Sequence, residues 1–485
     1  MDSLNTFFVC SFLIFVIGGC DVSSNLDLYP EDSLTEGNFY EDQSQIQAAV
    51  DDSYRQMGRL YDAFSIVDLY GNLFSDDGAV IAQLAGTPVD QPIDRHQIRS
   101  YNDRIQTAWE DTYNVIFNMN NIINHVEKTD LEIEEELKSK WLAQALMVRS
   151  LAYFNLVRAF GDVPLVLKII EPDESCEYLR EDTNIIYEQL IDDLNFAKEN
   201  LPAKYSGDNV GRVTKYGAAA VLAKVYLTVG DNTAAQSELE LIINSGQFSL
   251  DANADGSINT EDYKYLFESD TKNSQASVLE AQYMSGINAR NSNHQEAYSP
   301  YLDNFNHPLI DESIERGGGV NTPTDDLASE FEEGDPRKEL TVVPGFTTTS
   351  GDFVDYPFTL KYFDSNWYNP GQNFEVIRYA DILLMYAEVT DDSEYLNKVR
   401  ERVGLAPFGS KKYPSNLYPT LKSAIEHERR MELALEMHRM FDLVRTGRVI
   451  DVMQSKVENF DSNQLLFPIP QNFIDKTGVK QNTGY

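Results

Sequence analysis

The sequence predicts a mostly α-helical protein in which paired helices support one long irregular segment. Apolar residues recur at spacings of three and four along 44–245 and 374–485, which is the period of an α-helix. Alanines cluster on some of these faces, where helices can cross closely. Residues 246–373 lose this period and are rich in Gly, Pro, Asn, Asp, Ser and Thr. So long an irregular segment inside a globular chain is usually functional.

The helices of the first stretch are placed by their apolar positions and by the residues at their ends. We expect them at about 44–60, 105–126, 132–160, 184–200, 215–229 and 233–244. Gly161 should end the third of these, Thr214 is a suitable N-cap for the fifth, and Gly230 should end that helix. Trp109 and Trp141 lie on apolar helical faces, and we expect both in the core.

Short turns join these helices into pairs. The pairs resemble tetratricopeptide-type hairpins, although no clean repeat of about 34 residues can be found. Hairpins of this kind need stacked neighbours to bury their apolar faces. The expected architecture is therefore an α-α superhelix that carries a loop-rich ligand-binding region at 246–373.

Two long helices are expected at the end of the chain, over 374–402 and over 419 to about 457. The second has acidic and basic residues at spacings of three and four, such as Glu426 with Arg430 and Glu436 with Arg439. Such spacing is typical of ion pairs along one helix face. We therefore interpret this Glu- and Arg-rich helix as structural.

The first twenty residues, MDSLNTFFVCSFLIFVIGGC, have the pattern of an export signal. The apolar run from Phe7 to Ile17 is too short for a membrane-spanning helix and has the length of a signal-peptide core. Two glycines before Cys20 resemble a lipobox, although no Lys or Arg precedes the apolar run. We expect a signal peptide at 1–19, a lipidated Cys20 with an extended tether to residue 43, and one domain over 44–485. An ordinary secretory signal cut near Gly19 is the alternative.

The composition excludes some functions. The formal net charge is −39, and a surface this acidic repels phosphate backbones, so nucleic acid is not an expected partner. After loss of Cys10 and lipidation of Cys20, only Cys176 remains. A single cysteine forms no intramolecular disulfide and no cysteine-based metal site.

The segment LDANADGSINTEDY predicts a calcium-binding loop. Asp251, Asn253 and Asp255 occupy the first, third and fifth loop positions, Ser257 can offer its carbonyl, and Asp262 stands at the twelfth. Calcium takes six to eight oxygen ligands around a tight turn, and this spacing supplies them. An aspartate at the last position resembles dockerin loops more than sensor EF-hands. The alternative is a turn that matches the pattern by chance, because Asn, Asp and Gly favour turns in any case.

Several longer motifs resemble the SusD/RagB family. The C-terminal ones are VIRYADILLMYAEV from Val376, VRERVGL from Val399, HERRMELALEMHRMFDLVRTGR from His427, LLFPIPQ from Leu465 and the final QNTGY. The upstream ones are WEDTYNVIFNMNNII from Trp109, FGDVPL from Phe160, GRVTKYGAAAVLAKVYL from Gly211 and PTDDLASEFEEGDPR from Pro323. They cover nearly the whole mature chain in the family's order.

The resemblance implies a fold and a function. It implies four tetratricopeptide-like helix pairs, a lipid anchor and a place on the outer-membrane surface. Family members pair with a SusC-like TonB-dependent transporter and deliver oligosaccharides to it, or peptides in one branch. The expected function is therefore non-catalytic capture of an oligo- or polysaccharide, with peptide capture as the alternative.

Sugar binding needs a flat apolar face that stacks on a pyranose ring, with amides or charges for the hydroxyls. Trp367 and Tyr368, with Asn366 beside them, are the first expected ligand residues. The segment LYGNLFSDDG contributes Tyr70, Asn72 and Asp76, at a place where family members often have a ligand loop. Tyr301 in the irregular segment is a further candidate.

A surface glycoside hydrolase is the rival from another functional class. Glycoside hydrolysis needs two carboxyl groups opposed across a cleft. The adjacent acids at 76–77 and 332–333 diverge on most backbones, and such pairs arise by chance among 78 acidic residues. His427 and Glu428 begin an HExxH-like pattern, but Met431 stands where the second His would be. We therefore expect no catalytic residues and no zinc site.

Overall fold

The computed structural model describes residues 40–81, 88–170, 174–287, 289–300, 305–306, 313–314, 317–348 and 350–485. The signal peptide, Cys20 and Tyr301 lie outside these ranges, so the predictions made for them stay predictions. Within these ranges, no helix combines the length and the apolar character needed to cross a bilayer.

The protein is mostly helical, and the helices of the first stretch form where the sequence predicts them. They are α1 (Gln43–Leu60), α4 (Asp103–Lys128), α5 (Glu135–Phe160), α6 (Thr183–Asn200), α7 (Lys215–Val229) and α8 (Asn232–Ile243). Gly161 follows α5 with φ +72°. The Thr214 side chain accepts from the Gly217 N–H, and Gly230 ends α7 in the left-handed conformation. Trp109 and Trp141 are both in the core, as expected.

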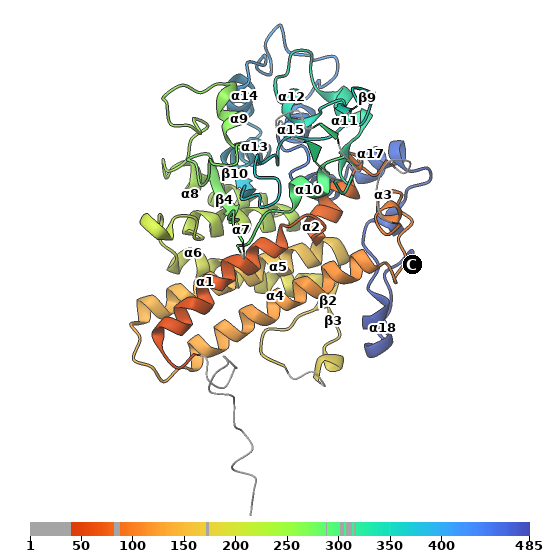
Figure 1. Ribbon diagram of the computed structural model, residues 1–485. Coiled ribbons are helices and arrows are strands. Elements are labelled where there is room, and N and C mark those ends of the chain that lie inside the picture. Colours follow the sequence, from red (N-terminus) through yellow and green to blue (C-terminus); the bar gives the residue numbers. More distant parts are fainter. Residues whose placement is uncertain are drawn as a thin grey trace, which may run out of the picture.

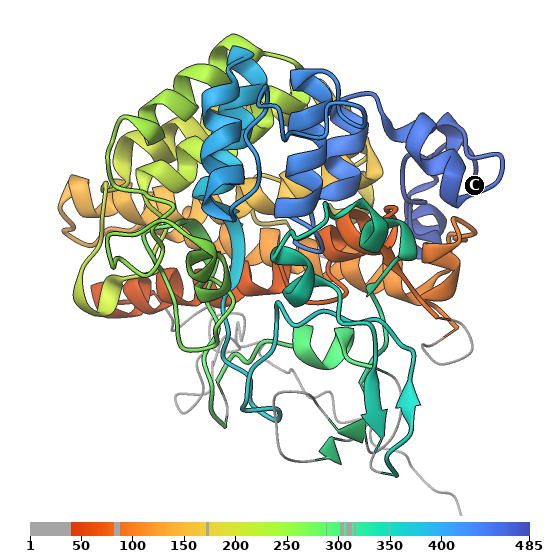
Figure 2. The same ribbon diagram turned by 90° about the horizontal axis from the view of Figure 1, so that it is seen from above.

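The helices pack in chain order, each against the next, from α4 to α8. The stack then continues with α13 (Tyr379–Thr390), which packs against α8, and with α14 (Ser393–Arg402) against α13. The Tyr386 hydroxyl of α13 donates to the Glu240 carboxylate of α8 at 3.0 Å. Figure 2 shows α13, in light blue, beside the green helices that precede the loop-rich region. The loop-rich region is therefore an insertion into a continuous helical stack.

The first of the two predicted C-terminal helices begins later than expected. Its first five residues form strand β10 (Phe374–Arg378), which pairs antiparallel with β4 (Ser277–Ala281). The pairing places Glu375 opposite Glu280 and gives Phe374 a partner in Ala281. A left-handed residue, Asp391, then separates α13 from α14. Tertiary pairing with a distant strand overrides the helical period here.

The second predicted C-terminal helix is three helices: α15 (Leu421–Glu432), α16 (Arg439–Arg445) and α17 (Val449–Lys456). Leu435 and Met437 have φ of +62° and +66°, so the chain turns between α15 and α16. The turn is buried, with Leu435 at 1% and Met437 at 4% exposure. Burial of the two apolar side chains stabilises this turn. The helical spacing of the sequence did not predict it.

Short elements make up the rest of the described chain, and all strand pairs are antiparallel. Before α8 they are α2 (Ile66–Asp68), η1 (Leu69–Leu73), β1 (Gly78–Ala79), α3 (Gln91–Asp94), β2 (Val163–Pro164), η2 (Glu174–Glu177), β3 (Arg180–Glu181) and η3 (Gly207–Asn209). After α8 they are α9 (Thr260–Tyr265), α10 (His294–Tyr298), β5 (Phe305–Asn306), β6 (Ser313–Ile314), β7 (Thr322–Pro323), α11 (Asp325–Glu330), α12 (Arg337–Thr341), β8 (Phe346–Thr348), β9 (Phe353–Val354), η4 (Ser462–Gln464) and α18 (Gln471–Thr477). The strand orders are β1-β7, β2-β3, β4-β10 and β6-β5-β8-β9.

The arrangement places the irregular segment on one side of the helices. In Figure 1 the long helices α1, α4 and α5 lie side by side, and most short elements of 246–373 lie above them. In Figure 2 most of these short elements lie on the lower side, while α12 reaches α15 through the ion pair of Arg337 with Glu428. The helical layer is thus a frame on which the loops are mounted.

Candidate functional site

Two loops of the irregular segment lie against each other and expose apolar side chains. We call them the paired loops, residues 284–292 (of which 288 is not described) and 364–371. The Ser292 N–H donates to the Pro370 carbonyl at 2.9 Å. The side-chain amides of Asn291 and Asn369 are 3.2 Å apart. A Cβ at Gly371 would collide with the backbone of Ser285, so this close approach requires glycine.

The second of the paired loops is held in shape by a buried carboxylate. Asp364 accepts from the Asn366 N–H at 2.8 Å and from the Gly371 N–H at 2.7 Å. The two bonds close the turn that carries Trp367 and Tyr368. Tyr368 is 72% exposed, and Trp367 is half-buried against the core. The structure thus places three of the predicted ligand residues, Asn366, Trp367 and Tyr368, on one hydrogen-bonded turn at the surface.

The first of the paired loops adds apolar surface beside that turn. Met284 is 64% and Ile287 is 88% exposed. The loop is closed by the Met284 N–H, which donates to the Arg290 carbonyl at 2.8 Å. Exposed apolar side chains on adjoining loops, with amides among them, are typical of a ligand-binding surface. The sequence reasoning did not find Met284 and Ile287, because nothing near them in the sequence marks the contact with residues 364–371.

Tyr70, Asn72 and Asp76 are not at this surface, and their predicted role in ligand binding is wrong for the described conformation. All three are buried, with exposures of 0%, 0% and 3%. The Tyr70 hydroxyl donates to the Leu465 carbonyl at 2.6 Å. The side-chain oxygen of Asn72, Oδ1, accepts from the Met437 N–H at 2.8 Å. Apolar packing and long-range hydrogen bonds draw this segment inward, where a ligand has no access.

Asp76 serves as an anchor for two arginines. It accepts from Nε and Nη2 of Arg439 at 2.7 and 2.8 Å, and Arg430 approaches it at 3.0 Å. Burial alone would raise the pKa of Asp76, but Arg439 and Arg430 lower it to about 2. Asp77 beside it accepts from Arg430 at 2.8 Å. Both carboxylates of this adjacent pair are therefore occupied by structural ion pairs.

Asp68 is a buried junction that the sequence reasoning missed. Its carboxylate accepts from the Tyr298 hydroxyl, from the amide of Asn72 at 3.2 Å and from the amide of Asn321 at 2.7 Å. Burial raises the pKa of Asp68 to about 6. The junction ties the segment after α1 to the irregular region, because Tyr298 and Asn321 are more than 200 residues away from Asp68 in sequence.

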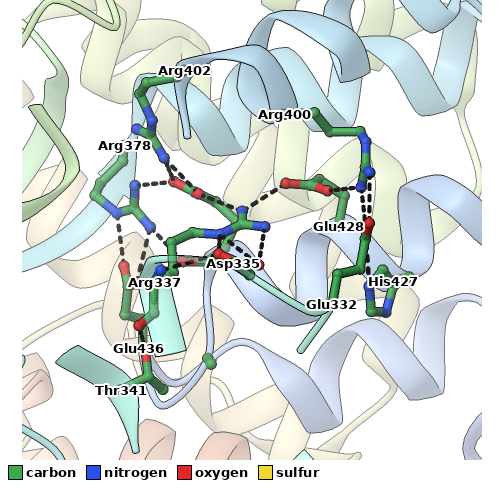
Figure 3. Close-up of polar contacts among 12 residues, drawn as sticks. Glu332, Asp335, Arg337, Thr341, Arg378, Arg400, Arg402, His427, Glu428 and Glu436 are labelled. Atoms are coloured by element: carbon green, nitrogen blue, oxygen red, sulfur yellow. Dashed lines mark hydrogen bonds and ion pairs between the residues drawn. The ribbon is translucent and has the colours of Figure 1, made fainter. Parts of the chain in front are cut away.

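A larger buried network of charges fastens the irregular region to α15 (Figure 3). Arg337 bonds Glu428 at 2.6 Å and Glu432 at 3.0 Å. Arg378 and Arg402 each approach Glu432 at 2.6 Å. Burial would raise the pKa of Glu432, but the guanidinium groups of Arg402, Arg378 and Arg337 hold it well below its usual range. Such multiply paired carboxylates are fixed structural elements.

The ion pairs predicted along the last helix do not form. Glu426 pairs with Arg448 and Glu436 with Arg378, while Arg430 reaches Asp76, Asp77 and Asp326. The charged residues in and just after α15 thus bond other elements, because most of the helix is buried. The structural interpretation of this helix holds, but the partners are distant in sequence.

In the calcium-like loop, the carboxylates that would bind calcium accept hydrogen bonds from backbone N–H groups of the same loop. Asp251 accepts from the N–H groups of Asp255 and Gly256 at 3.1 and 2.9 Å. Asp262 is fully buried and accepts from the Asn259 N–H at 2.8 Å. Gly256 has φ +87°, as the tight turn requires. Among the residues that the structure describes, no three His, Cys, Asp or Glu side chains are grouped to hold a metal ion.

Comparison with known proteins identifies the family. A model described as "Starch-binding associating with outer membrane" matches residues 27–227, and the model of the SusD family matches residues 352–485. The chain belongs to the SusD/RagB family. Its SusD-family relatives include "SusD-like protein P25" of Formosa agariphila, 27% identical over 91% of this chain and 90% of the relative. A SusD-like protein of Bacteroides ovatus is 25% identical over 91% of this chain and 82% of the relative.

Solved structures of SusD-like proteins have the same fold. A "Laminarin binding SusD-like protein" is 28% identical, covers 92% of this chain and 100% of its own, and superposes with a TM-score of 0.77. Surface glycan-binding protein A from Bacteroides fluxus, 21% identical with a TM-score of 0.75 over 92% and 100% of the two chains, shares the fold.

Family membership confirms that the chain is not an enzyme, because SusD-family proteins are non-catalytic glycan-binding proteins. It also confirms the coarse placement, because the family is one of outer-membrane-associated, surface glycan-binding proteins. Among the residues that the structure describes, the paired loops are the candidate ligand-binding surface of this SusD-family fold.

Proposed function

We propose that this SusD-family chain is a lipid-anchored surface protein that captures a glycan and passes it to a SusC-like TonB-dependent transporter. The observation that carries the proposal is the turn held by Asp364, which presents Tyr368 and Trp367 beside Asn366. An aromatic ring supplies the apolar face for a pyranose, and side-chain amides both donate and accept bonds to its hydroxyls.

The charge of the protein favours an uncharged ligand. With a net charge of −39, the surface repels polyanions at long range. A neutral glycan meets no such barrier. Binding through a few stacked rings and exposed hydrogen bonds is weak enough for rapid release, which handover to a transporter requires.

Laminarin is the first ligand to test, because the name of one relative states that it binds laminarin. Starch, which the description of one matching family model names, is the second. Both are neutral polymers of glucose. We propose that a glucan of this kind binds across the paired loops.

The test compares binding of laminarin and starch to the purified mature protein and to Trp367→Ala, by isothermal titration calorimetry. We expect at least one glucan to bind and the variant to lose at least tenfold in affinity, about 1.4 kcal/mol. Tyr101→Ala is a matched control, because Tyr101 is 66% exposed in the turn between α3 and α4. Unchanged binding by Trp367→Ala would place the site elsewhere. Capture of a peptide pool, with no glycan bound, would favour the peptide alternative.

The anchor and the transporter need their own test. We expect Cys20→Ser to move the protein from the membrane fraction to the soluble fraction, and affinity capture of the native protein to recover a TonB-dependent barrel. Retention of the Cys20→Ser protein in the membrane would argue against lipidation of Cys20.

We also propose that Ca²⁺ binds the loop of Asp251, Asn253, Asp255, Ser257 and Asp262 in a structural role. Carboxylate, amide and carbonyl oxygens are the ligands that this cation prefers. The support is the chemistry of the donors and the positive φ at Gly256.

A further inference from the structure

A cavity of about 350 Å³ lies within the helical layer, between α13, α15 and α16. In Figure 2 these helices lie at the top, while most of the irregular segment lies at the bottom. Its volume is within the range of about 300–1,000 Å³ that small-ligand sites span. No Phe, Tyr or Trp is among the described residues that line it. Its chemistry therefore differs from that of the paired loops.

Two arginines offer hydrogen-bond donors at this cavity. Arg430 and Arg439 line it, and both are more than nine-tenths buried. Their Nε and Nη2 atoms bond carboxylates: those of Arg439 bond Asp76, and those of Arg430 bond Asp77 and Asp326. Within the described chain, Nη1 of neither side chain has a hydrogen-bond partner. The bonds to the carboxylates hold both guanidinium planes in place before any ligand arrives.

Acidic and basic side chains are equally numerous in the lining of the cavity. Five acidic and five basic side chains line it. The acidic ones include Glu388 and Asp442, which Arg445 bonds at 2.6 and 2.8 Å. His438 is neutral, because burial and the nearby Lys224 hold its pKa well below the usual range. The lining arginines are already paired with carboxylates, so a ligand with a net charge would itself be buried without compensation, at a cost that buried charges make large. An uncharged ligand with many hydroxyls meets no such cost.

We infer that this cavity is a second saccharide site, which takes one or two neutral sugar units by hydrogen bonds from their hydroxyls instead of by stacking. Neighbouring hydroxyls of a sugar can accept from Nη1 of Arg430 and Arg439 and donate to the lining carboxylates. The inference takes only the class of ligand, a neutral glycan, from the proposed function. The site would hold a short product or chain end, while the paired loops hold the polymer.

The test uses maltose and laminaribiose, the two-glucose units of starch and laminarin, with methyl-labelled protein. Ile425 and Leu433 line the cavity and serve as reporters. We expect their methyl resonances to shift with one of these sugars, equally in the native protein and in Trp367→Ala. Glucuronate, an anionic sugar, should bind at least tenfold more weakly. Absence of any shift, an equal response to glucuronate, or loss of the shift in Trp367→Ala would overturn the inference.

A variant adds a second readout. Arg439→Lys keeps a charge opposite Asp76 but removes the planar second edge of the guanidinium, so we expect at least tenfold weaker disaccharide binding. Arg149→Lys is the matched control, since Arg149 makes a buried pair with Asp193 away from the cavity. If Arg439→Lys does not fold, the native titration alone decides. Failure of the proposed function appears separately, as polymer binding that Trp367→Ala leaves unchanged.

Discussion

The helical frame and the irregular region are stabilised in different ways. The frame, α4 to α8 with α13, α14 and α15, packs apolar faces of its helices against one another. The irregular region is tied to the frame by buried polar contacts between residues far apart in sequence, such as Arg337 with Glu428 and Lys361 with Glu436. The frame should therefore fold and persist largely by itself, and the irregular region should depend on a few charged junctions.

Glu432→Gln tests this difference most strongly. The substitution leaves Arg337, Arg378 and Arg402 buried without their shared carboxylate, and breaking a buried pair costs about 3–5 kcal/mol. We expect a loss of that size in urea unfolding, with hydrogen exchange rising first in residues 325–378. Glu394→Gln is the control, because its pair with Lys398 is exposed and such pairs contribute at most about 1 kcal/mol. Uniform loosening of frame and loops would contradict the comparison.

Acidification tests another buried polar contact of the irregular region, the bond between His294 and the Tyr61 carbonyl. His294 in α10 is buried, bonds the Tyr61 carbonyl at 2.7 Å, and burial lowers its pKa to about 4. The unfolded chain binds this proton near pH 6.5, about the ordinary value, whereas the folded chain stays neutral until about pH 4. The contribution of His294 to stability is therefore complete above pH 6.5 and falls as the pH drops from 6.5 to 4, by up to about 3 kcal/mol.

The corresponding measurement is urea unfolding at a series of pH values, for the native protein and for His294→Gln. We expect the variant to be less stable at pH 7 but to lose less on acidification, because it has no proton to gain at this position. Identical pH profiles would show that the folded protein does not hold His294 neutral.

Calcium removal should affect the irregular region more than the frame. If Ca²⁺ is present at about 100 times its dissociation constant, its removal costs about 2.7 kcal/mol. We expect EGTA to lower the thermal midpoint and to raise hydrogen exchange at residues 251–262. Asp255→Asn, on the exposed part of the loop, should remove the EGTA response, whereas Asp208→Asn, an exposed aspartate between α6 and α7, should keep it. A thermal midpoint that does not respond to EGTA would contradict calcium binding at this loop.

Thr214→Ala has the smallest expected effect and is confined to the frame. The Thr214 side chain caps α7, and loss of such a cap costs about 1 kcal/mol. We expect a loss of that size in global unfolding with unchanged ligand binding. A change in glycan affinity would show that the frame and the binding surface are coupled.

The apolar periodicity and the capping residues predicted the helices of the frame, because both depend only on residues that are close in sequence. Thr214, Gly161 and Gly230 mark helix ends that the structure confirms. The same patterns failed where distant contacts decide the structure. Residues 374–378 follow a helical period but pair with a strand about a hundred residues earlier. The chain turns at Leu435, which has a positive φ, because the apolar side chains of this turn are buried.

The candidate surface was predicted in part for the same reason. Trp367, Tyr368 and Asn366 are neighbours in sequence, so their shared turn could be foreseen. The segment of Tyr70 and Asn72 has similar composition, yet its rings and amides find partners in the interior. Met284 and Ile287 join the surface only through contacts between loops, which a single sequence does not show.

Most of the insertion lies between two points that are adjacent in space, the start of β4 and the end of β10. The Tyr379 N–H at the start of α13 donates to the Ala276 carbonyl at 2.8 Å, just before β4. The entropy of closing a loop grows only slowly with its length, by roughly 0.6 kcal/mol for each doubling. Once the β4–β10 pair clamps the two ends, lengthening or shortening the chain between them costs the frame little. The length and sequence of the inserted segment can therefore change while the helical frame keeps its arrangement.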